Sequence, residues 1–349
     1  MRGAGSVRWD RCARSMVVSA ILSPGMPISA YLCQTTTRPG SRLRLALEYP
    51  SLPGGIGCLA LHEDGSTVRS IGSGNLGLRA VWRWRLLSSG LRVLPDFLII
   101  GAMKSGTSSL FHHLTQHPEL VPAFEKEIHY FDQDDASFAG PTGSLARYRS
   151  HFPIKAMIPA RSLVYEATPK YLCHETSARR ISEVVPNARM VLTLRNPSDR
   201  AISHYFHTQR NRPDPESLHA AMCEDVDRCG SLGRSDVAAS EPMDYTSYVG
   251  RGIYRPQIER FLEYFDRTDL HVIEGERFFE DPRPVLANLF EFLGIRSDVP
   301  IRDLAAQNVS QRDQLVWPRT RAVLDEFFRP HNERLFEFLG TRYDWNQAE

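Results

Sequence analysis

A turn rich in glycine and hydroxyl residues lies near residue 100 and has the composition of an anion-binding loop. The chain reads GAMKSGTS over residues 101–108, after an apolar run at 97–100 and before an amphipathic pattern typical of a helix. In a strand–turn–helix unit of this kind, backbone N–H groups and the positive end of the helix dipole converge on one anion. Glycine lets the backbone fold tightly, and lysine adds a point charge. We therefore predict a phosphate site formed by Lys104, Ser105, Gly106, Thr107 and Ser108.

The spacing of this loop differs from that of nucleoside triphosphatases, which follow the pattern G-x-x-x-x-G-K-[ST]. Here Lys104 precedes the second glycine, and Thr107 and Ser108 follow that glycine directly. No clear strand ends in an aspartate that would hold magnesium for phosphoryl transfer. A small-molecule kinase that uses ATP and magnesium is therefore an alternative that the spacing disfavours.

A second candidate anion site follows at residues 190–210. The apolar run 190–194 has the length of a buried strand, Arg195 stands at its carboxyl end, and Pro197 suits the first turn of a helix. Open α/β sheets bind ligands at the carboxyl edge of their strands, so Arg195 is placed to meet a phosphate. Ser203, farther along the predicted helix, adds a hydroxyl for the same anion.

A carboxylate and an imidazole lie close together in the segment KEIHYFD, residues 126–132. If residues 127–131 are extended, Glu127 and His129 share one face of the backbone. Beside a bound group donor, such a pair can work as acid and base. The segment therefore supplies two candidates for the base that activates an acceptor.

Together these three motifs resemble the sulfotransferases that use 3′-phosphoadenosine-5′-phosphosulfate (PAPS). The pattern K-E-x-H-[FY]-F-D is similar to the heparan sulfate glucosaminyl (N- and 3-O-) sulfotransferases and their bacterial relatives, and the resemblance extends from Val93 almost to the C-terminus. It implies that the first loop holds the 5′-phosphosulfate and that Arg195 and Ser203 grip the 3′-phosphate. It also implies that Glu127 is the catalytic base. Small-phenol and steroid sulfotransferases use a histidine in another context, so His129 is the second candidate.

The chain departs from this branch of the family at two places. The segment YEATPKY at 165–171 is similar to the family's E-K-[ST]-P-x-Y stretch, but Ala167 stands where those enzymes carry lysine. That contact is absent or is supplied by Lys170. The family's late Lys-Gly-Arg phosphate loop and its flanking disulfide are also missing, and Arg312 or Arg319 could replace the loop. The resemblance implies acceptor contacts from His129, Asp132 and Lys170.

The predicted reaction is the in-line transfer of a sulfuryl group from PAPS to a hydroxyl, or an amine, of a saccharide or glycolipid acceptor. Glu127 removes the acceptor proton, and Lys104 stabilises the charge that develops on the oxygen of the departing nucleotide. Lysine and the helix dipole supply the positive charge, so we expect no metal. A non-catalytic nucleotide- or glycan-binding module is a second alternative, against which the intact Lys104, Glu127 and Arg195 argue.

The elements that position these residues are predicted to form an α/β fold, a three-layer P-loop-like domain with a central parallel sheet flanked by helices. The 349 residues, 42% of them hydrophobic, are enough to bury such a core. Strands are expected at residues 97–100, 163–166, 190–194 and 270–274, with helices between them and a closing helix at 321–339. We assign residues 81–349 to this domain.

Residues 1–80 have a different character and are predicted to be a poorly structured N-terminal extension. Gly, Pro, Ser and Arg are scattered through them without a sustained period. Arginines precede a short apolar run at 16–22, which is typical of a weak signal peptide; a start codon assigned too far upstream is the other interpretation. Residues 79–94 either form an amphipathic helix that touches a membrane surface or pack on the domain.

Charge and metal-ligand spacing restrict the partners further. The net charge of +1 gives no global basic field of the kind that binds nucleic acid. The six cysteines are scattered and show no zinc-like spacing. We expect a cytoplasmic enzyme or, alternatively, a membrane-associated one without a transmembrane helix.

Overall fold

The structure, a computed structural model of the chain, divides into two units at Gly72/Ser73. It describes residues 75–139, 143–209, 215–231, 247–305 and 316–345, together with four short strands in the first unit. These strands form an antiparallel sheet in sequence order, and they are β1 (Ala30–Tyr31), β2 (Leu45–Glu48), β3 (Cys58–Leu61) and β4 (Arg69–Ser70). The sequence did not predict them. The rest of residues 1–74 lies outside the described part, so the division into an extension and a domain stays a prediction.

The second unit is built on a five-stranded parallel sheet, as the sequence predicted. The strands run in the spatial order β6 (Leu120–Pro122), β7 (Leu163–Ala167), β5 (Phe97–Gly101), β8 (Arg189–Leu194) and β9 (Leu270–Glu274). Four of them match the expected strands. The edge strand β6 was missed because its three residues end in a proline and are too short to form a pattern.

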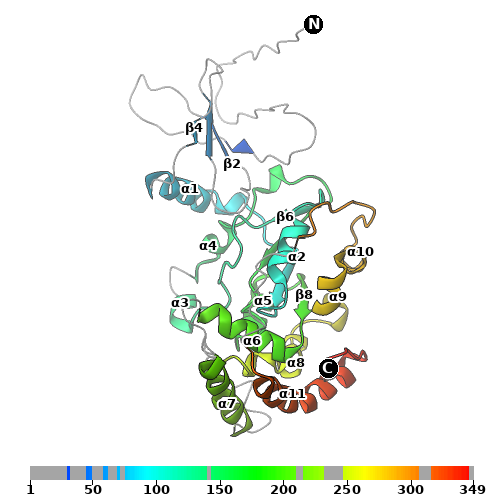
Figure 1. The fold of residues 1–349 in the computed structure, drawn as a ribbon. Coiled ribbons are helices and arrows are strands. Elements are labelled where there is room, and N and C mark those ends of the chain that lie inside the picture. The colour runs from blue at the N-terminus through cyan, green and yellow to red at the C-terminus, as the bar shows by residue number, and fades with distance from the viewer. Residues whose placement is uncertain are drawn as a thin grey trace, which may run out of the picture. The chain divides into compact units, whose positions relative to one another are not determined.

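Helices follow most strands and cover the sheet (Figure 1). They are α1 (Asn75–Leu87), α2 (Thr107–Leu114), α3 (Asp135–Ala139), α4 (Leu145–Arg149), α5 (Ser177–Val184), α6 (Pro197–Thr208), α7 (Pro215–Ser231), α8 (Tyr254–Leu262), α9 (Gly275–Glu280), α10 (Pro282–Leu293) and α11 (Pro318–Leu339). Helix α11 contains the closing helix that the sequence predicted at 321–339.

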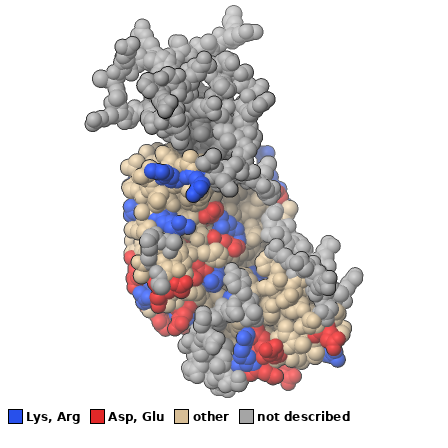
Figure 2. All heavy atoms as spheres, turned by 90° about the vertical axis from the view of Figure 1, so that its left-hand side faces the viewer, with Lys and Arg blue, Asp and Glu red and all other residues tan. Residues whose placement is uncertain are grey.

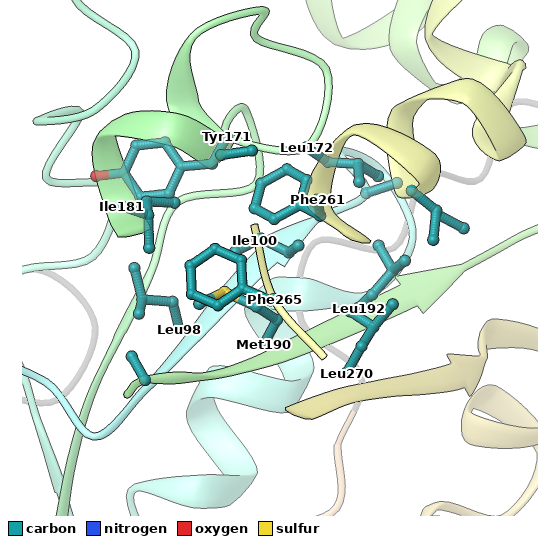
Figure 3. Packing of buried hydrophobic residues seen from close by; sticks show 14 of the residues in the cluster. Leu98, Ile100, Tyr171, Leu172, Ile181, Met190, Leu192, Phe261, Phe265 and Leu270 are labelled. Carbon is teal, nitrogen blue, oxygen red and sulfur yellow. The ribbon is translucent and has the colours of Figure 1, made fainter. Parts of the chain in front are cut away.

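The two faces of the sheet bury different sets of helices, which makes the domain three-layered. Because successive strand residues point to opposite faces, Phe97 and Ile99 pack with α2 and α10, whereas Leu98 and Ile100 pack with α5, α8 and the end of α11. Figure 3 shows the second of these clusters, where side chains of the sheet meet aromatic rings of the covering segments. The predicted α/β class and layer arrangement are confirmed.

Helix α1 and the segment after it pack on the rest of the domain through arginines. The buried Arg85 donates from Nε to the backbone oxygen of Ser150 at 2.7 Å, and Arg92 donates from Nη1 to that of Phe152 at 2.6 Å. The guanidinium of Arg85 also lies 4.1 Å from the ring centroid of Phe124. These contacts match the second interpretation of residues 79–94, a lead-in helix that packs on the domain.

Candidate active site

The predicted site residues gather at the carboxyl edge of the sheet. Strand β5 lies between β7 and β8, so the chain leaves β5 on one side and returns on the other. This reversal of strand order is where open α/β sheets bind ligands. The loops that follow β5 and β8 start side by side, since Ala102 N donates to Thr193 O at 2.7 Å and Thr193 Oγ1 donates to Gly101 O at 3.1 Å.

The loop after β5 has the geometry of an anion cradle. Lys104 and Gly106 have positive φ values of 70° and 92°, and Gly106 is the N-cap of α2. The first N–H groups of a helix have no partner within it, so this turn presents donors toward the sheet edge. A Cβ on Gly106 would lie 2.7 Å from Cε1 of Phe279, and one on Gly101 would lie 2.6 Å from Cβ of Leu172. The tight turn therefore requires both glycines.

Arg195 stands at the end of β8 and is held loosely. Its Nη2 lies 3.9 Å from Oδ2 of Asp199, and its Cζ lies 5.5 Å from the ring centroid of Phe279. The same ring closes on Gly106, so Phe279 lies between the phosphate loop and Arg195. Since the guanidinium is partly exposed and only weakly paired, its donors are accessible to an anion.

Helix α6 begins immediately after Arg195. The side chain of Asn196 accepts a hydrogen bond from Ser198 N at 2.9 Å, and Pro197 occupies the first turn. Pro197 in the first turn is as the sequence predicted, and the Asn196 side chain caps the helix. Ser203 is half-buried on the same helix.

Positive charge also accumulates behind the phosphate loop. Arg200, on α6, is fully buried, and burial lowers its pKa to about 10. Burial lowers the pKa of the neighbouring His204 as well, and the charges of Arg200, Arg251 and Lys104 lower it further. His204 is therefore neutral, and the arginines and lysine give this side of the sheet edge a positive potential.

The segment around Glu127 is not extended as the sequence analysis supposed. Glu127 and His129 have positive φ values of 63° and 54°, and Glu127 N donates to Ala167 O at 2.9 Å. The turns bring the two side chains together nonetheless, with Nε2 of His129 3.8 Å from Oε2 of Glu127. Nδ1 of His129 lies 2.7 Å from Oδ2 of the buried Asp132. The imidazole thus bridges two carboxylates.

These contacts fix the charges of the group. The hydrogen bond with Asp132, followed by that with Glu127, raises the pKa of His129 to about 9. The hydrogen bond from His129 lowers the pKa of Glu127 to about 2, and Lys126, which pairs with Glu127, contributes to the shift. Burial opposes ionisation of Asp132, but His129 and Lys170 outweigh it and lower its pKa. At neutral pH the histidine is an imidazolium between two carboxylates.

Lys170 reaches this group from the turn after β7. Its Nζ lies 3.4 Å from Oδ2 of Asp132. Ala167, where the sequence analysis noted a departure, is fully buried at the end of β7. Lys170, three residues after Ala167, thus places a cation beside Asp132.

Three residues that were not among the predicted site residues connect the loop after β8 with α9 and with the segment after α11. Glu276, on α9, accepts at Oε1 from Asn196 N at 2.8 Å and at Oε2 from Trp345 Nε1 at 2.9 Å. Asn196 Nδ2 in turn donates to Trp345 O at 3.2 Å. Neither these contacts nor the position of Phe279 was predicted. In the sequence, Glu276 and Phe279 are only a carboxylate and an aromatic residue of one short helix, and Trp345 is a single tryptophan after the last helix.

The candidates for the missing late phosphate loop are only partly described. Arg312 lies outside the described residues. Arg319 is at the start of α11, with its guanidinium 4.0 Å from the ring centroid of Trp317. Neither residue is therefore assigned to the site.

Within the described residues, no group of three or more His, Cys, Asp or Glu side chains is arranged to hold a metal ion. His112 instead contacts Asp303 at 3.0 Å, and His117 contacts Arg296 O at 2.9 Å. In the same part of the chain, no helix is both long and apolar enough to cross a bilayer.

The fold and the loops at its edge define an α/β domain in which the glycine-rich turn after β5 and Arg195 after β8 could hold an anionic ligand. Residues 94–317 match the pattern that defines the sulfotransferase domain family. The chain therefore belongs to this family, whose members are enzymes that transfer sulfate groups.

Individual relatives agree with this assignment. The chain is 28% identical over 305 residues to the human heparan sulfate glucosamine 3-O-sulfotransferase 6, with 81% of each protein covered. It is 24% identical over 324 residues to the membrane-associated sulfotransferase kil1 of Dictyostelium discoideum, covering 73% of this chain and 67% of that protein. A sulfotransferase structure from Alicyclobacillus acidocaldarius matches with a TM-score of 0.56 and 27% identity, covering 73% of this chain and all of that one.

Proposed function

We propose that this enzyme transfers the sulfuryl group of PAPS to a hydroxyl, or an amine, of a saccharide or glycolipid acceptor. The observation that carries the proposal is the adjacency of β5 and β8, which brings the cradle of Lys104 and the guanidinium of Arg195 to one edge of the sheet. Two separated cationic sites suit a nucleotide with phosphates at both ends of its ribose. The relatives named for heparan sulfate support a saccharide acceptor.

The cradle suits the 5′ end of the donor. Amides of residues 105–108 and the N-terminus of α2 would hold the phosphate, and Lys104 would stabilise charge on the leaving oxygen. Arg195 and Ser203 would bind the 3′-phosphate. The donor supplies an activated sulfuryl group, so the protein's part is positioning and electrostatic stabilisation.

Glu127 is the proposed base. At neutral pH His129 already carries both ring protons, because its pKa is raised to about 9, and so it has no lone pair to accept a proton. Glu127 is an ionised carboxylate whose paired donors, Lys126 and His129, can exchange for an acceptor hydroxyl. As these contacts loosen, the basicity of the carboxylate rises toward that needed for proton transfer. His129, Asp132 and Lys170 would orient the acceptor.

The enzyme is further proposed to bind the surface of membranes without spanning them, through the side of α1 that does not pack on the domain. Leu86, Leu87 and Leu91 are 46%, 80% and 66% exposed, and Arg79 and Arg83 share the exposed face of α1. Apolar side chains flanked by arginines suit an anionic bilayer surface. On the face drawn in Figure 2, charges of both signs are interspersed over the described residues, so a contact of this kind would be local.

A calorimetric titration tests the donor. The protein should bind 3′-phosphoadenosine-5′-phosphate and show no heat of binding with ATP–Mg²⁺ at the same concentration. In a separate transfer assay, it should move ³⁵S from labelled PAPS to desulfated heparin or to a glycolipid extract. Tight binding of ATP–Mg²⁺ without binding of the bisphosphate would replace this proposal with the kinase alternative.

A further inference from the structure

A buried carboxylate with no cation beside it lies on β7. Glu166 is fully buried, and within the described chain no Lys or Arg side chain pairs with it. Three hydroxyl groups donate to it instead: Tyr148 to Oε1 at 2.5 Å, Thr168 to Oε2 at 2.9 Å and Tyr171 to Oε2 at 3.3 Å. A buried charge is costly unless it is paired or fully hydrogen-bonded, so such an arrangement needs a reason.

Two of these hydroxyl donors also hold Tyr130. The Tyr171 hydroxyl accepts a hydrogen bond from Tyr130 N at 3.1 Å. The Tyr148 ring stacks on that of Tyr130, with centroids 4.3 Å apart and planes at 14°. Because a hydroxyl has one proton to donate, Tyr171 can present its lone pairs to Tyr130 while its proton points to Glu166.

Tyr130 lies inside the loop that carries the proposed chemistry, directly after His129. Glu127 and His129 both have left-handed φ values there, a conformation that costs free energy in residues other than glycine and must be held by surrounding contacts. Tyr130 N–H is one of the points where the loop is attached to the segment that follows β7.

We infer that Glu166 is a positioning residue: through Tyr171 and Tyr148 it holds Tyr130, and with it the loop of Glu127 and His129, in the orientation needed for transfer. The inference rests on the proposed function only for the chemistry of that loop. The attachment itself is a property of the fold.

The protonation state of Glu166 gives the inference a distinctive signature. The groups that face it are Tyr148 from α4, Thr168 and Tyr171 after β7, and Asp132 from the loop after β6. Burial raises the pKa of Glu166 to about 7, the hydroxyl donors oppose this shift, and the charge of Asp132 adds to it. Protonation adds an O–H donor that faces hydroxyl donors, which weakens the hydrogen bonds to Tyr148 and Tyr171, so the loop loosens as the pH falls below 7.

Glu166→Gln tests the inference, because the amide has the same shape but places an N–H group against hydroxyl donors. We expect kcat to fall about tenfold or more, the scale of losing a buried hydrogen bond to a charged group. The dissociation constant of 3′-phosphoadenosine-5′-phosphate should stay within about twofold of wild type, because the donor loops follow β5 and β8. In the profile of kcat/KM, which reports groups of the free enzyme, the acidic limb near pH 7 should disappear; His129 and Glu127, with pKa values of about 9 and 2, do not titrate there.

Two tyrosine variants supply the matched comparison. Tyr171→Phe removes only the hydroxyl that joins Glu166 to Tyr130 and should reproduce the loss in kcat. Tyr165→Phe, on the same strand as Glu166, removes a hydroxyl that donates to Phe111 O at 3.2 Å and should leave kcat unchanged. A wild-type kcat in Tyr171→Phe, or an unchanged acidic limb in Glu166→Gln, would overturn the inference; if Glu166→Gln does not fold, Tyr171→Phe decides.

Hydrogen exchange separates this inference from the proposed function. In the wild-type protein, amides of residues 127–132 should lose protection between pH 7.5 and 6, after correction for the intrinsic rate, and Glu166→Gln should remove that pH dependence. This readout needs neither donor nor acceptor. Absence of any binding to the bisphosphate would refute the proposed donor, whereas pH-independent protection in the wild type would refute the role of Glu166.

Discussion

The guanidinium of Arg195 and the ring of Phe279 face each other at 5.5 Å, and the same ring closes on Gly106 of the phosphate loop. One aromatic side chain therefore contacts both of the proposed anion-binding elements. A cation over a ring is stabilised while its N–H edges stay available to a ligand. Arg195 is thus held in place without a strong carboxylate partner competing with an anion.

Arg195→Ala should weaken donor binding more than it slows the reaction. The 3′-phosphate does not react, so a contact to it contributes equally to the ground state and the transition state. A charge-assisted contact is worth about 1.5–3 kcal/mol, or roughly 10- to 150-fold in the KM for PAPS. Steady-state kinetics should show kcat within a few-fold of wild type. Arg296→Ala, which removes an exposed arginine paired with Asp298, is the control; an unchanged KM in Arg195→Ala would remove this residue from the donor site.

Glu127→Gln should lower kcat by about 10²–10⁴ while the affinity for 3′-phosphoadenosine-5′-phosphate barely changes, because the amide cannot accept a proton. His129→Ala should cost less and act mainly on the KM of the acceptor. Rapid-quench measurements with saturating donor separate the two effects. The reverse result, near-normal turnover in Glu127→Gln with none in His129→Ala, would make the histidine the base.

The raised pKa of His129 predicts a dependence of stability on pH. Its folded-state pKa of about 9 lies above the unfolded value of 6.5, so its stabilising contribution is complete below pH 6.5 and is lost as the pH rises through 9. Urea unfolding at pH 6.5 and 9.5 should show a larger loss of unfolding free energy in the wild type than in His129→Gln. Parallel losses in both proteins would mean that Asp132 and Glu127 do not hold the imidazolium in solution.

Removal of residues 1–72 should leave a folded domain that binds the donor, since the boundary falls before α1 and all proposed site residues follow it. Circular dichroism and titration with the bisphosphate would check this. A cut at residue 90 is the informative contrast, because it removes Arg85 and its bonds to the backbone of Ser150 and Phe152. If both shortened chains fold equally well, α1 does not contribute to the domain.

Substituting Leu86, Leu87 and Leu91 together by glutamate should abolish sedimentation with vesicles that contain phosphatidylserine, without changing the activity on a soluble acceptor. Leu145→Glu, at another exposed leucine, is the control. Equal sedimentation of the triple variant and the wild type would place membrane contact elsewhere or nowhere.

The sequence could predict the sheet and the turns that follow β5 and β8, because these depend on local patterns; the anion-binding role of the turns stays a prediction. Buried runs such as 190–194 are continuous, and glycine and lysine spacing marks the turn after β5. The sequence could not predict the backbone conformation at Glu127, since left-handed φ values in residues other than glycine arise from tertiary contacts. Nor could it assign Glu166 a set of hydroxyl partners, because Tyr148 and Tyr171 reach it only once the chain is folded.

The hydrogen bonds that join Asn196, Glu276 and Trp345 also bear on the order in which parts of the site form while the chain is synthesised. The cradle after β5 needs Thr193 beside it and the ring of Phe279 on Gly106, and Asn196 finds its partner in Trp345 only after a further 149 residues. Contacts so distant in sequence form late, because the loop between them must first be closed. During synthesis the protein should therefore complete its phosphate cradle only after Phe279 is made, and reach full affinity for the nucleotide once Trp345 can join Asn196.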